Sequence, residues 1–282
     1  MKSERFCGGK DMDLYELYDL IDLQTEMIQK LKLVGEKIDL KQIDFYLKQL
    51  MDRETAVESY RHLKTLLEED KDNMKMLYCQ LECARRVFDQ YQKKHIKDTI
   101  YKDTMKCFSR FIEECKKKNG RMFFDRDWWT YRQISMSLFR IGELEYEFQK
   151  YEGENVIAIH IPSDANLSKG AVDASMKQAE IFFQNYYHDY KYEKYSCDSW
   201  LLSPRLKPLL SKKSDILSFQ NRFHIVRENN EDKGYIEWLF QVPIDTNYKN
   251  LPAKTDLQKK VKEILLNGGN IGSAYGIITM SS

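Results

Sequence analysis

Apolar residues recur at a spacing of three and four along the first 120 residues, a stretch that contains no proline. Leu14, Leu17 and Ile21, for example, fall on one face of an amphipathic helix. This spacing predicts helices over about 14–31, 40–50, 54–70, 73–93 and 97–118. The chain therefore begins with a helical bundle, which we place at residues 1–120.

The pattern changes after Gly120. The string "DRDWWTYRQISMSLFRIG" keeps a helical spacing at first, but "ELEYEFQ" (143–149) alternates strictly. Its glutamates form one face and Leu144, Tyr146 and Phe148 the other, as in a half-exposed strand. The run "VIAIHI" (156–161) predicts a strand that is buried on both faces.

A strand–helix–strand unit follows. The loop "PSDANLSKGA" ends near Ser168, a good N-cap, and a helix is expected from there to about residue 189. The run "KYSCDSWLL" (194–202) is the second strand, and a helical connection of this length makes the two strands parallel. Ser203 and Pro204 end that strand and start a helix to about 217.

The last part of the chain predicts further strands and one helix. The alternating runs "FQNRFHIV" and "YIEWLFQV" indicate an antiparallel hairpin. A capping box at Thr255 and Gln258 starts a helix that ends at Gly268 and Gly269, and "SAYGIITM" is the final strand. The fold class is therefore α+β, with a helical bundle at 1–120 and a mixed sheet flanked by helices at 121–282.

Composition excludes some functions. The 45 Lys and Arg residues nearly balance 44 Asp and Glu, so no global charge favours nucleic acid or an anionic membrane. No apolar run is long enough for a membrane span or a signal peptide, and we expect a cytoplasmic protein. The six cysteines show no zinc spacing, so we interpret them as reduced thiols, with Cys79 and Cys83 in the core, and predict no metal.

The order of elements after residue 140 resembles the GNAT acyltransferase fold. The strings "FRIGELEYE", "AIHIPSDANLS", "CDSWLLSPRLKPLL", "ILSFQNRFHIV" and "LPAKTDLQKKVKEILLNGG" resemble a bacterial family of acyltransferase domain-containing proteins. Members of that family join a helical N-terminal domain to a GNAT-like C-terminal domain. The resemblance implies an N-acyltransferase that uses acetyl-CoA or another acyl-CoA as co-substrate and a small-molecule amine or hydroxyl as acceptor.

The resemblance also implies a binding site. The pantetheine arm would lie between "VIAIHI" and "SCDSWLL", and the pyrophosphate would bind at the helix start, near Ser163, Ser168, Lys169 and Gly170. The closely spaced glycines of the usual motif are absent, because only Gly170 stands in this loop. The alternative is a capped helix start that faces solvent.

Three residues are catalytic candidates. His160 can act as general base toward an acceptor amine, or it can satisfy a buried hydrogen bond at the strand end. Cys197 or Ser199 can bond or protonate the leaving sulfur, or either can simply pack in the strand. A thiol or serine hydrolase that pairs Cys197 or Ser199 with His160 is a further alternative, although no nucleophile elbow is present.

The second hypothesis for the whole protein is a binding or scaffold protein that keeps the fold without the transferase site. The loop that lacks the glycine motif is the main argument for it. Self-association into a homo-oligomer is compatible with either hypothesis.

Overall fold

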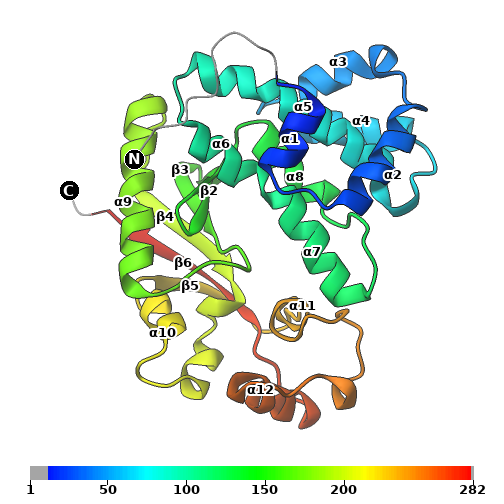
Figure 1. Cartoon of the computed structure of the whole chain (residues 1–282). Coiled ribbons are helices and arrows are strands. Elements are labelled where there is room, and N and C mark those ends of the chain that lie inside the picture. The colour runs from blue at the N-terminus through cyan, green and yellow to red at the C-terminus, as the bar shows by residue number, and fades with distance from the viewer. Residues whose placement is uncertain (1–11, 281–282) are drawn as a thin grey trace. The chain divides into compact units, whose positions relative to one another are not determined.

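A computed structural model of the chain describes residues 12–280, which divide into two compact units (Figure 1). The units are Met1–Arg140 and Ile141–Ser282. The domain boundary expected at residue 120 lies inside the first unit and stays a prediction. Cys7, one of the cysteines interpreted as a reduced thiol, lies outside the described residues.

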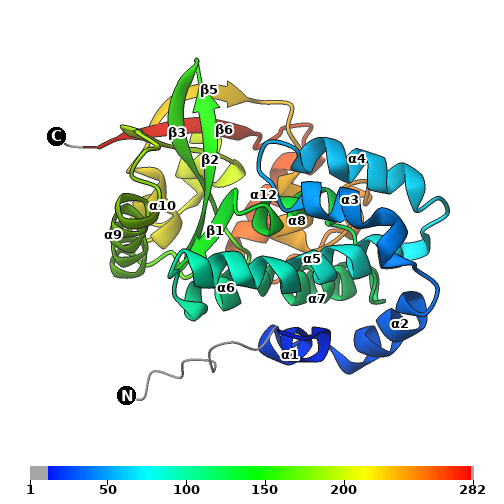
Figure 2. The ribbon, with the colours of Figure 1, turned by 90° about the horizontal axis from the view of Figure 1, so that it is seen from above.

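The first unit is helical. Its helices are α1 (Leu14–Leu20), α2 (Thr25–Gly35), α3 (Leu40–Leu50), α4 (Ala56–Leu66), α5 (Met74–Lys93), α6 (Asp98–Met105), α7 (Cys107–Asn119) and α8 (Asp127–Ile134), with a 3-10 turn η1 (Lys71–Asn73). The long helix α5 is central, because α1, α2, α3, α6 and α8 all pack against it. Figure 2 shows α3 and α4 on one side of α5 and α1 and α2 on the other.

The core of this unit is built on α5. Cys79 and Cys83 are both fully buried there, which confirms their interpretation as core residues. Glu82 is also buried, and it accepts hydrogen bonds from the guanidinium groups of Arg85 and Arg86. A buried carboxylate needs such partners, because water cannot solvate it there.

Two predicted helices are each interrupted. The helix expected over 14–31 stops at Leu20, and Asp22 adopts a positive φ of 55° before α2 begins. The helix expected over 97–118 divides at Lys106 into α6 and α7. Apolar spacing continues across both breaks, so the periodicity alone does not reveal a short turn.

The second unit contains a six-stranded sheet in the order β1-β2-β3-β4-β6-β5. Its strands are β1 (Leu138–Ile141), β2 (Leu144–Tyr151), β3 (Glu154–His160), β4 (Lys194–Ser199), β5 (His224–Asn229) and β6 (Ser273–Thr279). β3 and β4 are parallel, whereas the β2–β3, β4–β6 and β5–β6 pairs are antiparallel. The α+β prediction, with a helical part followed by a mixed sheet, is confirmed.

Helices flank this sheet. They are α9 (Lys169–Tyr186), α10 (Asp215–Gln220), α11 (Tyr235–Phe240) and α12 (Asp256–Leu266), with 3-10 turns η2 (Trp200–Leu202), η3 (Pro204–Leu209) and η4 (Tyr248–Asn250). α9 lies along one face of the sheet (Figure 1), where the Ser175 hydroxyl bonds the Tyr146 hydroxyl at 2.9 Å. The predicted Thr255 capping box at the start of α12 is confirmed.

Several local predictions are wrong. The run expected as a strand over 235–242 is mainly the helix α11, and β5 pairs with β6 instead of forming a hairpin with that run. Tyr235, Ile236 and Phe240 are buried together on one side of α11, so tertiary packing overrides the strand alternation. The strand expected to reach residue 202 ends at Ser199, and η3 replaces the first part of the expected α-helix. β1 itself was not predicted.

Among residues 12–280, no helix combines the length and the apolar character that crossing a bilayer requires.

Candidate active site

The parallel strands β3 and β4 separate at their carboxyl ends. Their ladder ends at Ala158 and Ser196. β3 nevertheless runs on to His160 against β2, and β4 runs on to Ser199 against β6. We call these two strand ends, which are no longer paired with each other, the fork. An extended ligand that enters the fork meets two strand edges. Exposed strand edges bind extended chains, such as peptides, through main-chain hydrogen bonds.

His160 lies at the β3 side of the fork and forms a pair with Glu147 of β2. The distance from His160 Nε2 to Glu147 Oε2 is 2.8 Å, and Gln149 Nε2 donates to the same carboxylate oxygen at 2.7 Å. An ionised carboxylate only accepts hydrogen bonds, so with Glu147 ionised this pair selects the tautomer that carries its proton on Nε2.

Asp198 lies on the β4 side of the fork, on the same face as His160. Ser196 is opposite Ala158, so side-chain alternation places Ser196 and Asp198 on the face of Ala158 and His160. Arg227 lies 3.8 Å from the Asp198 carboxylate. Partial desolvation raises the pKa of Asp198 above its ordinary value, although 60% of its side chain is exposed, and Arg227 and His160 act in the opposite direction.

This face of the sheet is concave. Tyr151 of β2 stacks on Tyr275 of β6, with ring centroids 5.0 Å apart and planes at 24°. β3 and β4 lie between β2 and β6 in the strand order, which in a flat sheet places β2 and β6 about 14 Å apart. The contact therefore requires the β2–β3 hairpin to coil over the sheet. Figure 2 shows β2 and β3 running steeply across the direction of β5 and β6.

Cys197 and Ser199 alternate with Ser196 and Asp198 along β4, so they belong to the other face of the strand. Cys197 lies between Ser196 and Asp198 in β4, so its side chain points to the opposite face of the sheet. It is buried, and burial raises its pKa well above the ordinary value of a thiol. The Ser199 hydroxyl accepts the N–H of Leu201 at 3.2 Å and starts η2. Side-chain alternation thus places Cys197 on the face opposite to His160, and the roles of Cys197 and Ser199 at a leaving sulfur stay predictions.

The loop from residue 161 to 168 connects the fork to the first turn of α9. Ser163 lies in a turn at the start of this loop. Ser168 occupies the N-cap position, but its side chain makes no capping hydrogen bond. A Cβ added at Gly170 meets no atom within 4 Å, so the space around the helix start is open. An uncapped first turn with open space beside it can receive an anion.

Two cations lie at this helix start. Lys169 is mostly exposed, and its Nζ lies 3.1 Å from Asp173. Arg222, from the turn after α10, donates to Asp173 at 2.6 Å and to the Lys169 carbonyl oxygen at 3.3 Å. No local motif in the sequence identifies Arg222, because it reaches α9 only through the packing of α10.

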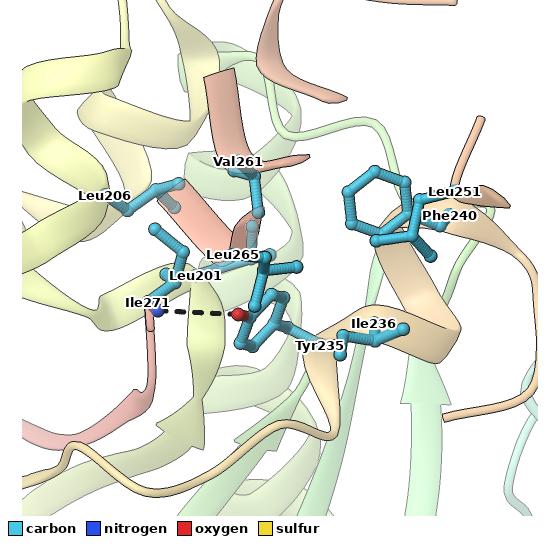
Figure 3. Close-up of a cluster of buried hydrophobic side chains, with 9 residues drawn as sticks. All are labelled: Leu201, Leu206, Tyr235, Ile236, Phe240, Leu251, Val261, Leu265 and Ile271. Atoms are coloured by element: carbon cyan, nitrogen blue, oxygen red, sulfur yellow. Dashed lines mark hydrogen bonds between the residues drawn. The ribbon is translucent and has the colours of Figure 1, made fainter. Parts of the chain in front are cut away.

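An apolar cluster lies beyond the carboxyl ends of the two strands, and Figure 3 shows its buried side chains. Its buried members are Leu201, Leu206, Tyr235, Ile236, Phe240, Leu251, Val261, Leu265 and Ile271. The Tyr235 hydroxyl accepts the Ile271 N–H at 3.4 Å and donates to Asn270 at 2.7 Å. Ile161 and Trp200, which directly follow the two strand ends, pack against this cluster. Apolar packing thus begins directly after the two strand ends.

The sequence pattern misplaced the partner of His160. It assigned Glu145 and Glu147 to the exposed face of their strand. In the structure both residues are buried, with exposed fractions of only 3% and 7%. The predicted hairpin could have identified this partner, because the register of β2 and β3 places Glu147 diagonally opposite His160. Among residues 12–280, no group of three or more His, Cys, Asp or Glu residues is placed to hold a metal ion.

Comparison with known proteins gives both halves of the chain a family match. The model described as GNAT-like C-terminal domain matches residues 138–278, and the model described as N-acyltransferase N-terminal domain matches residues 12–136. No curated protein matches the chain.

Solved acyltransferases share the fold. One is an acyltransferase mutant in complex with octanoyl-CoA, with a TM-score of 0.78 and 17% identity over 95% of this chain and 88% of that chain. Another is an acyltransferase in complex with decanoyl-CoA and teicoplanin, with a TM-score of 0.70 and 17% identity over 96% of this chain and 100% of that one.

Proposed function

The chain belongs to the acyltransferase family that has a GNAT-like C-terminal domain behind an N-acyltransferase N-terminal domain, and from this we propose that it transfers an acyl group from acyl-CoA to a small-molecule amine or hydroxyl. The observation that carries the proposal is the fork between β3 and β4, with His160 at its edge. An acyl-CoA needs an extended slot for its arm, an anion site for its phosphates and a base near its thioester. The second unit offers candidates for all three.

We assign the parts of the donor to the parts of this site. The pantetheine arm lies in the fork, and the pyrophosphate lies at the first turn of α9, with Ser163, Ser168, Lys169 and Gly170 around it. Arg222 adds a second cation there. The acyl chain extends toward the apolar cluster beyond Ile161 and Trp200. Acyltransferases of this fold are found with octanoyl-CoA and decanoyl-CoA, so the donor range to test runs from acetyl to decanoyl.

His160 is the general base in this scheme. Its Nδ1 takes a proton from the acceptor amine while the amine nitrogen attacks the thioester carbonyl carbon. The carbon–sulfur bond breaks, its electron pair stays on sulfur, and the thiolate takes up one proton from solvent or from Ser199. Glu147 holds the imidazole through Nε2 and stabilises the positive charge that forms on the ring.

The acceptor is proposed to be a small molecule that reaches the concave face. An acyltransferase of the same fold forms a complex with teicoplanin and decanoyl-CoA. This complex supports a small-molecule acceptor for the present chain but does not identify that acceptor. We propose a cytoplasmic location, because the described cysteines are all free thiols, as expected in a reducing compartment. Self-association into a homo-oligomer stays a prediction.

Calorimetric titration tests the donor first. Acetyl-CoA, octanoyl-CoA and decanoyl-CoA are titrated into the protein, with free pantetheine as a control that lacks the nucleotide phosphates. We expect saturable binding of at least one acyl-CoA that is tighter than that of pantetheine. Release of free CoA thiol is then followed with a panel of amines for the wild type and for His160→Gln. The variant is expected to bind the donor normally and to lose turnover by about 10²-fold or more.

The second candidate is a binding or scaffold protein. Lys169 and Arg222 both contact Asp173, and this engagement with a carboxylate competes with phosphate binding. Such a protein gives no thiol release with any amine, and His160→Gln then changes nothing that can be measured. Absence of acyl-CoA binding at protein concentrations that detect micromolar affinity would favour this candidate over the transferase.

A further inference from the structure

Ser196 lies at the base of the fork. It is the last β4 residue in the parallel ladder, opposite Ala158 of β3. Its side chain shares a face with His160, because His160 and Ala158 are two residues apart in β3. A ligand arm that fills the fork down to the point where the ladder begins therefore meets this side chain next to the proposed base.

The Ser196 hydroxyl has an unusual environment. The residue is 0% exposed, and its Oγ has no hydrogen-bond partner among the residues that the structure describes. The phenol of Tyr275 lies nearby. Burial raises the pKa of Tyr275 and the Ser196 hydroxyl acts in the opposite direction, but the two groups form no hydrogen bond of ordinary geometry.

Two other buried serines of this unit, Ser175 and Ser203, have hydrogen-bond partners within the chain. Ser175 Oγ donates to the Ile141 carbonyl oxygen and also bonds Tyr146 and the Leu144 N–H. Ser203 Oγ donates to the Ile271 carbonyl oxygen at 2.7 Å. A buried hydroxyl without a partner costs free energy, and native proteins rarely keep one. Because the Ser196 hydroxyl, unlike those of Ser175 and Ser203, lacks a partner beside the fork, we look for its partner in a bound ligand.

We propose that Ser196 Oγ donates a hydrogen bond to a carbonyl oxygen of the pantetheine–thioester arm of bound acyl-CoA. The inference rests on the proposed function, since it needs a donor in the fork. The arm carries amide and thioester carbonyl groups along an extended chain, and each of them accepts a hydrogen bond from a hydroxyl. Binding then satisfies a group that the ligand-free protein leaves unsatisfied.

The proposal predicts opposite signs for stability and affinity. Ser196→Ala removes an unsatisfied group, so the thermal midpoint of the ligand-free protein stays the same or rises. The same variant binds octanoyl-CoA about tenfold more weakly, as expected for one lost hydrogen bond. The matched control is Ser175→Ala, which loses internal bonds and is expected to lower the midpoint while leaving the octanoyl-CoA affinity within about twofold.

The experiment combines circular dichroism melting with calorimetric titration of octanoyl-CoA. Ser196→Cys is measured beside the alanine variant. Its thiol fills the space of the hydroxyl but is a much weaker hydrogen-bond donor, so this variant controls for a cavity left by alanine. An octanoyl-CoA affinity of both Ser196 variants within about twofold of the wild type overturns the inference. A fall in midpoint for Ser196→Ala equal to that of Ser175→Ala also overturns it, since it reveals an internal partner.

The binding data distinguish a failure of the transferase function from a failure of the role of Ser196. If the wild type does not bind acyl-CoA, the proposed function fails and the role of Ser196 falls with it. If the wild type binds octanoyl-CoA and releases CoA, but the Ser196 variants bind it equally well, only the role of Ser196 is lost.

Discussion

Nε2 of His160 and Oε2 of Glu147 lie 2.8 Å apart on two strands that are joined by a two-residue turn. Both turn residues, Glu152 and Gly153, have positive φ, at 51° and 86°, as in the type I′ turn that matches the twist of a hairpin. The turn fixes the register of the hairpin, and the register places the two side chains diagonally opposite each other. Local geometry therefore orients the proposed base.

Glu147→Gln tests this orientation. The amide keeps the shape of the carboxylate but loses the charge that stabilises a protonated His160. Turnover should therefore fall by about tenfold or more. The loss should not exceed the contribution of the base itself, which is about 10²- to 10⁴-fold. The KM for octanoyl-CoA should not change, because Glu147 does not line the donor site in our assignment. Steady-state CoA release checks both values. The control is Glu154→Gln, at the far end of the hairpin, and full turnover in Glu147→Gln contradicts the proposed role.

The Tyr151–Tyr275 stack predicts an effect on the acceptor. Tyr151→Ala removes the contact that closes the concave face, which should lower the free energy of unfolding slightly and raise the KM for the acceptor several-fold. Tyr151→Phe keeps the ring and serves as control. Urea unfolding and initial rates at varied acceptor concentration provide the two readouts. Equal acceptor KM values for the wild type and both variants would place the acceptor elsewhere.

The start of α9 predicts a salt-dependent contribution to donor binding. Lys169→Gln should weaken octanoyl-CoA binding by about three- to tenfold at low salt and by less at high salt, because exposed charges are screened. The affinity for free pantetheine, which has no phosphates, should stay the same. Lys177→Gln, which alters another exposed lysine of α9, is the matched control. A loss of pantetheine affinity in the Lys169 variant would show that Lys169 does not act on the phosphates.

Cys197 should be chemically silent. Its burial raises the thiol pKa, so even at about pH 8 the folded protein presents no reactive thiolate at this position. We expect iodoacetamide to leave the Cys197 peptide unmodified in the native protein and to label it rapidly in denaturant, as measured by mass spectrometry. Fast native labelling of Cys197 would revive the thiol hydrolase alternative.

Glu82 predicts acid-sensitive stability in the first unit. Burial raises its pKa, but the hydrogen bonds from Arg85 and Arg86 outweigh this effect and hold the pKa below the ordinary value. A carboxyl group with a lowered folded pKa adds stability above its unfolded pKa of about 4.3, and this stability is lost as the pH falls through the folded pKa. Glu82→Gln should therefore lower the free energy of unfolding by about 3 kcal/mol at about pH 7 and by less at about pH 3.

Urea unfolding followed by circular dichroism at both pH values measures this difference. Glu58→Gln is the control, because its ion pair with Arg61 is exposed and should contribute less than about 1 kcal/mol. An equal loss of stability at both pH values for Glu82→Gln would mean that packing, rather than charge, explains the effect.

The sequence by itself determined the main course of the chain. Three-and-four spacing without proline specified the helical first part, and the alternation around Tyr146 specified β2. The connection between β3 and β4 was long enough for a helix, and this length made the two strands parallel. These signals are local, since each depends on side chains a few residues apart, and the structure confirms them.

Only the tertiary structure decided the site. The coiling of the hairpin that brings Tyr151 onto Tyr275 and the reach of Arg222 to the start of α9 join segments far apart in the chain. The burial of Ser196 and the helix at Tyr235, in place of a strand, depend on what packs around them. Local periodicity cannot encode such relationships, because burial and pairing are set by neighbours that folding brings together from distant positions.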